Sequence, residues 1–252
     1  MPKSLSAFVS FLFLLLALSL GGCGVHYVSG TISPNFQEYS IKKVAVLPFR
    51  TQTDFLEGKN SVIPQTSNFD PLQRDENGFF KCLVCPDHRA VATTPVEEGS
   101  ARLLTQIFTE RLRETGKFQL IPQEQVEAAV EALKKAADDG SEAITTNFAQ
   151  RIGTTLGADA VITGEVQAFT ERKGGPRAVE RPATVGFVAQ MMNVKDGRLL
   201  WSSDYYETQK NLSEDLNTLP LFLKRRGRWL TAQELAEYGV NEMIKTLPKP
   251  KG

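Results

Sequence analysis

Two cysteines and a histidine form the segment of this chain with the clearest potential for chemistry. Cys82 and Cys85 are separated by two residues, and His88 follows three positions later. Two thiolates and an imidazole supply three zinc ligands, whereas two thiols in an oxidising compartment form a disulfide. Thioredoxin-like exchange favours cysteines at a helix N-terminus, but Pro86 follows the second cysteine and no helical pattern begins there. Three alternatives stay open: a structural disulfide, a zinc site and a redox site.

A basic run near the C-terminus is the second candidate site. Residues 224–228 read Lys-Arg-Arg-Gly-Arg, and a tryptophan follows. Cations in such a run can bind phosphate groups or an acidic partner, and a neighbouring tryptophan can anchor an interface. The alternative is a solvated loop, because a few cations in a charge-balanced chain produce a weak field. The candidate partner-binding residues are Lys224, Arg225, Arg226, Arg228 and Trp229.

Motifs of common enzyme classes are absent from the sequence. It contains no G-x-S-x-G elbow, no G-x-x-x-x-G-K-[ST] loop and no G-x-G-x-x-G fingerprint. Of the two histidines, only His88 lies within the expected fold, since His26 precedes it. We therefore predict that the protein is not an enzyme and holds no cofactor, with zinc at the cysteine segment as the alternative.

The N-terminal residues predict an export signal. Residues 5–20 carry no charge and follow Lys3. A helix of that length rises about 24 Å, which is short of the ~30 Å hydrocarbon core of a bilayer, so the run is typical of a secretory signal. It ends in Leu-Gly-Gly before Cys23, which is similar to the lipobox of bacterial lipoproteins. The similarity implies cleavage after residue 22 and acylation of Cys23.

Acylation at Cys23 would determine where the protein resides. Three acyl chains make a stable membrane anchor. Gly24 rather than aspartate follows Cys23, a pattern that resembles outer-membrane sorting. We therefore expect a lipid-anchored protein at the periplasmic face of the outer membrane. With Cys23 acylated, Cys82 and Cys85 remain as an even pair in an oxidising compartment, which favours the disulfide.

Composition narrows the class of partner. The chain has 252 residues, with 29 Lys and Arg against 29 Asp and Glu, and it is 41% hydrophobic. These values are typical of a folded globular protein. The lack of a basic excess argues against nucleic acid as a partner. We expect the partners to be the membrane, further copies of the chain or envelope proteins.

Alternating strand and helix patterns predict one α/β (α+β) domain with a single mixed sheet and helices packed on its apolar face. The predicted order is β-α-β-α-α-β-β-β-α. Expected strands cover residues 43–50, 118–121, 159–169, 184–194 and 198–207, and expected helices cover about 96–116, 122–137, 143–156 and 232–247. Asp196-Gly197 predicts a hairpin turn, and Thr231 with Glu234 predicts a helix capping box.

The predicted organisation has four parts. A signal peptide over 1–22 precedes the lipidated cysteine and a linker over 23–41, then a domain over 42–247 and a tail over 248–252. Within the domain, residues 51–95 form an insertion without regular periodicity. Loops of that length are uncommon and are often functional, so we expect the insertion to recognise a partner.

Four segments together resemble the CsgG-like family of outer-membrane lipoproteins, whose fold is shared with the N-terminal domain of TolB. They read KVAVLPF, TGKFQLIPQEQVEAAVE, LGADAVITGEVQAF and NVKDGRLLWSS. The resemblance implies a non-enzymatic scaffold or accessory for envelope assembly or export that can form oligomers. The alternatives are a metal-binding or redox module at Cys82, Cys85 and His88, and a regulator of a peptidoglycan synthase.

Overall fold

The structure of the protein is a computed structural model. The residues that it describes are 28–51, 72–74, 80–82, 96–136, 146–176, 178–209, 225 and 227–250.

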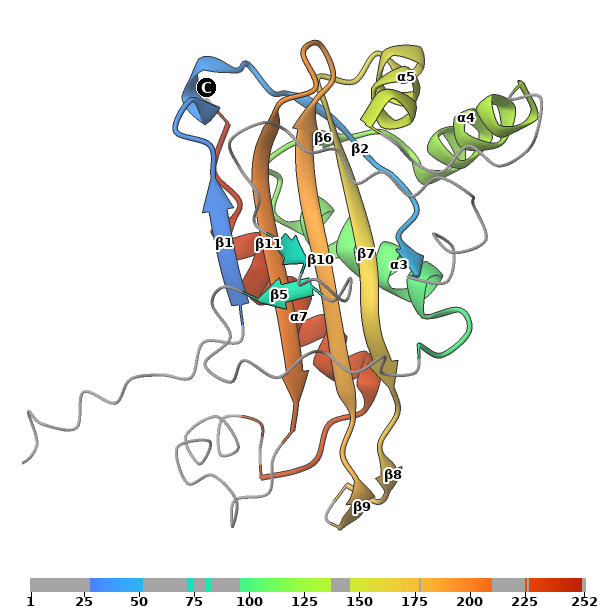
Figure 1. Cartoon of the computed structure of the whole chain (residues 1–252), viewed down its shortest axis with the longest axis vertical. Helices are drawn as coiled ribbons and strands as arrows, with labels where there is room; N and C mark the ends of the chain where they lie inside the picture. The colour runs from blue at the N-terminus through green and yellow to red at the C-terminus, as the bar shows by residue number, and fades with distance from the viewer. Residues whose placement is uncertain are drawn as a thin grey trace, which may run out of the picture.

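A mixed sheet forms the centre of the fold, and its main path has the strand order β1-β11-β10-β7-β2-β6 (Figure 1). In chain order, the strands are β1 (Val28–Ile32), β2 (Lys43–Val46), β6 (Gln119–Leu120), β7 (Ala160–Thr170), β10 (Thr184–Asn193) and β11 (Leu199–Thr208). The first four strands along this path pair antiparallel, whereas β2 pairs parallel with both β7 and β6. A short strand, β3 (Arg50–Thr51), also pairs parallel with β7. The predicted fold class, a single mixed sheet with packed helices, is confirmed.

Helices cover both faces of this sheet. The helices are α3 (Ser100–Glu114), α4 (Gln123–Ala136), α5 (Thr146–Leu156) and α7 (Ala232–Thr246). Val44 and Val46 belong to the core that includes α3 and α7, whereas Ala45 and Leu47 belong to the core of α4 and α5. Successive strand residues point to opposite faces, so the two helix pairs lie on opposite sides. The predicted element order is confirmed, but the expectation of one helix-covered face is not. No helix within the described ranges is long and apolar enough to cross a membrane.

Local signals in the sequence place the main turn and the last helix correctly. The side-chain oxygen of Asn193 accepts hydrogen bonds from the backbone N–H groups of Lys195 and Asp196, at 2.9 and 3.1 Å, which closes the turn between β10 and β11. The Thr231 hydroxyl accepts from the Glu234 N–H, and the Glu234 carboxylate accepts from the Thr231 N–H. This reciprocal pair is the predicted capping box of α7.

The structure differs from the predicted linker over residues 23–41. Val28–Ile32 forms the edge strand β1, which pairs with β11 so that Val28 lies opposite Tyr205. A short 3-10 helix, η1 (Phe36–Glu38), follows, and Phe36 is buried in the core. Gly30 permits β1 to pack closely on α7, because a Cβ there would lie 2.8 Å from the Thr246 side chain. Only residues 24–27 separate Cys23 from the first strand.

Two short hairpins occupy stretches that the sequence leaves irregular. In the insertion, β4 (Leu72–Arg74) pairs antiparallel with β5 (Phe80–Cys82). Between β7 and β10, β8 (Lys173–Gly174) pairs antiparallel with β9 (Val179–Arg181). The second hairpin continues beyond the end of the sheet at which β7 and β11 finish and β10 starts (Figure 1).

Candidate interaction site

Most of the cysteine segment and two cations of the basic run lie outside the described part of the chain. Cys82 ends β5 and lies opposite Leu72 in the backbone register. The predicted site residues outside the described part of the chain are Cys23, Cys85, His88, Lys224 and Arg226. Among the described residues, no group of three or more His, Cys, Asp or Glu side chains could hold a metal ion. The lipidation, disulfide and zinc predictions therefore stay predictions.

Arg225 lies inside the domain, in contrast to the solvated or partner-binding cation that the basic run suggests. Its two terminal nitrogens donate to the two carboxylate oxygens of Glu207, at 2.5 and 2.8 Å. The side chains are 7% and 2% exposed. The guanidinium also lies 4.3 Å from the centre of the Tyr238 ring, a cation–π contact. This arginine serves the packing of β11 against α7 and is not free for a partner.

A tyrosine completes this buried cluster. The Tyr205 hydroxyl donates to Glu207 at 2.7 Å. Burial raises the pKa of Tyr205 well above its usual range, and the nearby Glu207 charge adds to the effect. Burial opposes the charge of Arg225, but its hydrogen bonds to Glu207 outweigh that effect and raise the arginine pKa. The hydroxyl therefore stays a donor and the guanidinium stays charged, so Glu207 keeps all three hydrogen bonds.

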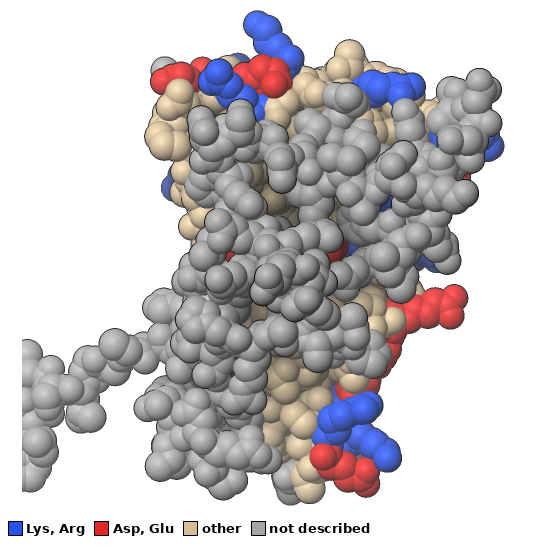
Figure 2. Space-filling model, viewed as in Figure 1, with Lys and Arg blue, Asp and Glu red and all other residues tan. Residues whose placement is uncertain are grey.

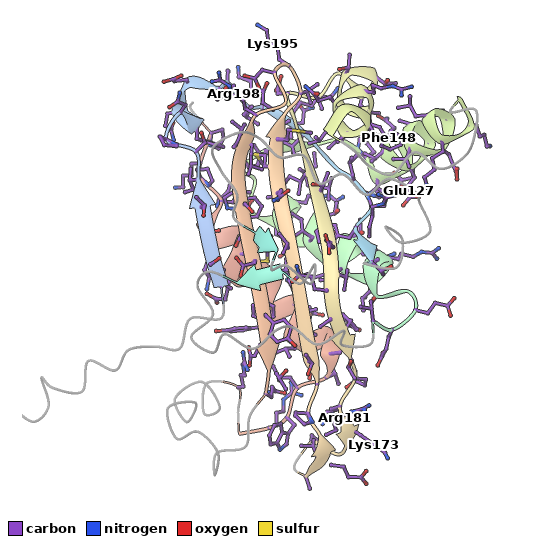
Figure 3. The ribbon with its side chains drawn as sticks, viewed as in Figure 1. Glu127, Phe148, Lys173, Arg181, Lys195 and Arg198 are labelled. Carbon is purple, nitrogen blue, oxygen red and sulfur yellow. The ribbon has the colours of Figure 1, made fainter. Side chains whose placement is uncertain are left out.

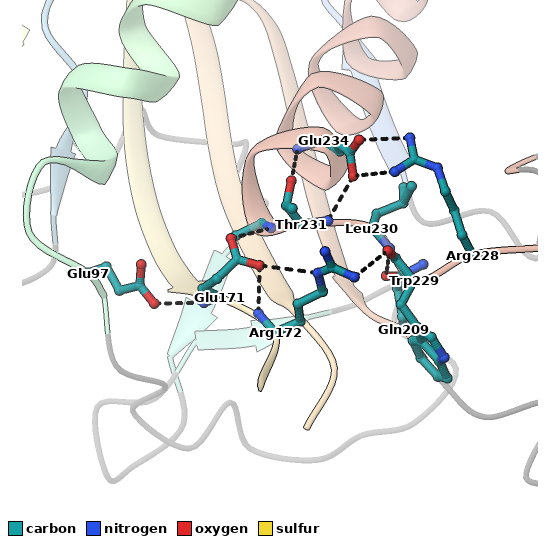
Figure 4. A network of polar contacts seen from close by, with 10 residues as sticks. Glu97, Glu171, Arg172, Gln209, Arg228, Trp229, Leu230, Thr231 and Glu234 are labelled. Atoms are coloured by element: carbon teal, nitrogen blue, oxygen red, sulfur yellow. Dashed lines mark hydrogen bonds and ion pairs between the residues drawn. The ribbon is translucent and has the colours of Figure 1, made fainter. Parts of the chain in front are cut away.

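The next residues of the basic run bind α7 and the β8–β9 hairpin (Figure 4). Arg228 donates to both carboxylate oxygens of Glu234, at 3.1 and 2.7 Å. Burial raises the Glu234 pKa, but the hydrogen bonds from Arg228 and from the Thr231 backbone prevail and lower it. Trp229 is 9% exposed, and its backbone N–H donates to the carbonyl of Pro176 at 2.9 Å. The run thus connects the start of α7 to the hairpin loop.

Two glutamates continue this network across the end of the sheet (Figure 4). Glu171 accepts a hydrogen bond from the N–H of Ala232, in the first turn of α7, at 3.0 Å. A carboxylate at a helix N-terminus is favoured by the unpaired N–H groups and the helix dipole. Glu97 in turn accepts from the Glu171 N–H at 2.7 Å, and Arg172 donates to the Trp229 carbonyl at 3.1 Å. We call the hairpin end the region formed by β8, β9, residues 171–172, the Arg225–Glu207 pair and the segment 227–232.

The charged side chains described on the hairpin itself are all exposed. Lys173 pairs with Glu180 at 3.2 Å, and their side chains are 71% and 72% exposed. Arg181 is exposed and lies directly opposite Lys173 in the strand register. Figure 3 labels both cations near the tip of the molecule, and Figure 2 shows blue and red side chains there.

The opposite end of the sheet carries an open hollow of about 760 Å³. It lies between α4, α5 and the β10–β11 turn, and its lining residues are Leu133, Gln150, Arg151, Thr154, Thr155, Val194 and Lys195. The Gln150 amide donates to the Val194 carbonyl at 3.2 Å, which fixes the turn to α5. Lys195 projects from the turn into solvent (Figure 3). We call α5, residues 194–198 and this hollow the turn end.

The hollow suits a protein segment better than an enclosed small molecule. Its lining combines hydroxyl and amide groups with cations around Leu133 and Val194, whereas small-molecule sites bury most of the ligand surface in a cleft. Sequence reasoning missed this site because its residues are spread from 133 to 195 and share no local pattern. The cations of this lining are Arg151 and Lys195.

The comparisons with known proteins favour one of the alternatives drawn from the sequence. Residues 100–206 match the family model of the peptidoglycan-synthase activator LpoB. The matched range runs from the start of α3 to Tyr206 in β11, so it includes all the residues that line the hollow and excludes the basic run. The resemblance to the CsgG-like family was wrong. Its four segments are a buried strand, a helix start, a second strand and a hairpin turn, which related folds share.

The solved structures that match the chain are distant in sequence, and their TM-scores lie below 0.5. The PelC dodecamer from Paraburkholderia phytofirmans is 13% identical, with 89% of this chain and 98% of that chain covered and a TM-score of 0.43. The LpoB C-terminal domain from Salmonella enterica is 15% identical, with 68% and 85% covered and a TM-score of 0.36. Lipoprotein GNA1162 from Neisseria meningitidis is 14% identical, with 73% and 94% covered and a TM-score of 0.37. None of the curated proteins matches the chain.

Proposed function

We propose that this chain is a lipoprotein, anchored through Cys23 at the periplasmic face of the outer membrane, that regulates a peptidoglycan synthase by docking and performs no catalysis itself. The observation that carries the proposal is the match of residues 100–206 to the family model of a peptidoglycan-synthase activator. The lipobox-like residues before Cys23 support the anchor and its periplasmic location.

The turn end is the docking site in this proposal. All the residues that line its hollow lie within the matched range. By contrast, the sequence-predicted docking residues Arg225 and Trp229 are buried and lie outside the matched range. Lys195 is exposed at the rim of the hollow, where a charge affects the recognition of a partner.

The test measures glycan-strand polymerisation by a detergent-solubilised peptidoglycan synthase from the same organism. The added protein is the processed chain 23–252 with Cys23→Ser, which keeps every described element. We expect the added chain to raise the polymerisation rate. Lys195→Glu should raise about tenfold the concentration of added chain that is needed for half-maximal stimulation. Arg102→Glu, an equal charge change at an exposed position of α3, is the matched control.

Each outcome bears on a different part of the proposal. No stimulation by the wild-type chain would overturn the regulatory function. If the Lys195→Glu variant stimulates the synthase as well as the wild-type chain does, the turn end is not the docking site. A second variant, Thr154→Arg, fills the hollow from its exposed rim and should weaken stimulation in the same way, which separates loss of the site from loss of one charge.

Self-association and the cysteine pair are separate proposals with their own tests. Light scattering on the detergent-solubilised acylated protein gives its mass, and a closed ring of copies would favour the scaffold or export role over the regulatory one. We also propose a disulfide between Cys82 and Cys85. Alkylation without reduction, followed by mass spectrometry, should leave both cysteines unmodified, whereas a zinc site would release zinc when a chelator is added.

A further inference from the structure

We infer that the hairpin end contacts the anionic lipid headgroups of the membrane that holds the anchor, so that the turn end points away from that membrane. The inference rests on the proposed anchoring at Cys23. It goes beyond that proposal because it assigns a membrane-facing surface and an orientation to the folded domain.

The short tether carries the first part of the argument. Residues 24–27 separate Cys23 from β1, so the Cα atoms of Cys23 and Val28 are at most ~18 Å apart. β11 runs toward the hairpin end, and β1 is antiparallel to it. The chain therefore enters β1 from the side of the hairpin end. A linker over the whole of 23–41 would have left the orientation free.

Strand register puts the hairpin and the anchor within the same reach. Val28 lies opposite Tyr205, three residues before β11 ends at Thr208, which is about 10 Å along the strand. Lys173 follows the end of β7 by three further residues, or about another 10 Å. The sum of about 20 Å is close to the ~18 Å reach of the tether, so the acylated cysteine and Lys173 can lie at about the same level along the sheet.

The turn end lies outside that reach. Leu199, at the start of β11, is six residues from the level of Val28, or about 20 Å in the opposite direction. The β10–β11 turn lies farther out still (Figure 1). The tether would have to fold back along β1 to bring this end to the bilayer.

The charges on the hairpin point to an anionic surface. Lys173 and Arg181 lie directly opposite each other, and like charges in that position destabilise a strand pair. Arg181 makes no ion pair within the described part of the chain. Glu180 pairs with Lys173, so these three side chains keep one net positive charge, and lipid phosphate can compensate it. The tip carries Gly174, Gly175 and Pro176 and no large apolar side chain, so the contact is electrostatic and does not involve insertion.

The test is co-sedimentation of the processed Cys23→Ser chain with phosphatidylcholine vesicles that contain or lack phosphatidylglycerol. We expect binding only to the anionic vesicles, and a loss of that binding at high salt. Each cation contributes about fivefold to binding at an anionic surface, so Lys173→Gln with Arg181→Gln should weaken it about 25-fold. Lys134→Gln with Lys135→Gln removes the same charge from an exposed part of α4 and should bind as the parent does.

The outcomes separate this inference from the proposed function. Equal binding by the hairpin variant and the parent, or no binding to anionic vesicles at millimolar lipid, would overturn the membrane contact. If the hairpin binds an acidic protein and not lipid, the chain should show no binding to the anionic vesicles. Mass spectrometry of the protein from its native membrane reports acylation of Cys23 independently, and the polymerisation assay contains no vesicles. Far-ultraviolet circular dichroism melts check that each variant folds.

Discussion

The two ends of the sheet use polar side chains in opposite ways. At the hairpin end, Arg225, Arg228 and Glu171 all make hydrogen bonds within the domain. At the turn end, a hollow stays open and Lys195 projects into solvent. The basic run thus serves contacts within the domain, and the exposed cations of the hairpin end are Lys173 and Arg181 on the hairpin itself. The turn end, which has no sequence motif, leaves its hollow open. A run of like charges in a sequence therefore does not by itself identify the surface that binds.

The largest expected effect comes from breaking the buried pair at the hairpin end. Arg225→Leu leaves Glu207, which is 2% exposed, without its cation. Removal of one partner of a buried ion pair costs about 3–5 kcal/mol of unfolding free energy. Urea denaturation followed by circular dichroism measures the loss.

The control for this prediction is the neighbouring exposed pair. Arg228→Leu breaks a pair whose side chains are 42% and 34% exposed, and such pairs contribute roughly 0–1 kcal/mol. Equal losses for the two arginines would show that burial does not distinguish them and would weaken the comparison between the two ends.

An intermediate effect is expected at the turn end. Gly153 in α5 lies against Val194 and Val161, so a Cβ at this position overlaps both valine side chains. Overpacking of this kind costs about 1–3 kcal/mol. Gly153→Ala should also displace the turn and weaken stimulation of the synthase. Thermal unfolding measures the loss of stability, and the polymerisation assay measures the loss of stimulation. If the destabilised variant still stimulates the synthase fully, the turn does not take part in docking.

A smaller loss is expected from the cap of α7. Thr231→Ala removes the hydroxyl that accepts from the Glu234 N–H, and the loss of such a cap costs about 1 kcal/mol. Thr231→Ser keeps the hydroxyl and should recover most of the stability in the same denaturation experiment. Equal stability of the alanine variant and the parent would mean that the Arg228–Glu234 pair and Glu171 hold the helix start without the cap.

The smallest effect has the opposite sign. Arg181→Gln removes one of two cations that lie directly opposite each other, so the unfolding free energy should rise by about 0.2–0.5 kcal/mol. The same change should weaken binding to anionic vesicles. A loss of stability instead would show that the cations do not repel in the folded protein, and it would remove one support for the membrane contact.

Local chemistry made part of this fold predictable. The Asp196-Gly197 turn and the Thr231 capping box depend on neighbouring residues, and both occur where the sequence places them. The strand β1 was missed because it contains Ser29 and Gly30 in place of an apolar run, and its pairing with β11 joins segments about 170 residues apart. The Arg225–Glu207 pair was missed for a similar reason, since burial of a cation depends on a distant carboxylate.

The short segment before β1 also changes how strong the membrane contact has to be. A tether of at most ~18 Å confines the domain to a small half-sphere beneath its anchor, which gives the hairpin an effective concentration on the order of 0.1 M at the bilayer surface. A headgroup affinity in the millimolar range is then enough to hold the orientation most of the time. The domain can therefore keep a defined orientation through a contact that, without the anchor, holds it at the membrane only when lipid is present at millimolar concentration.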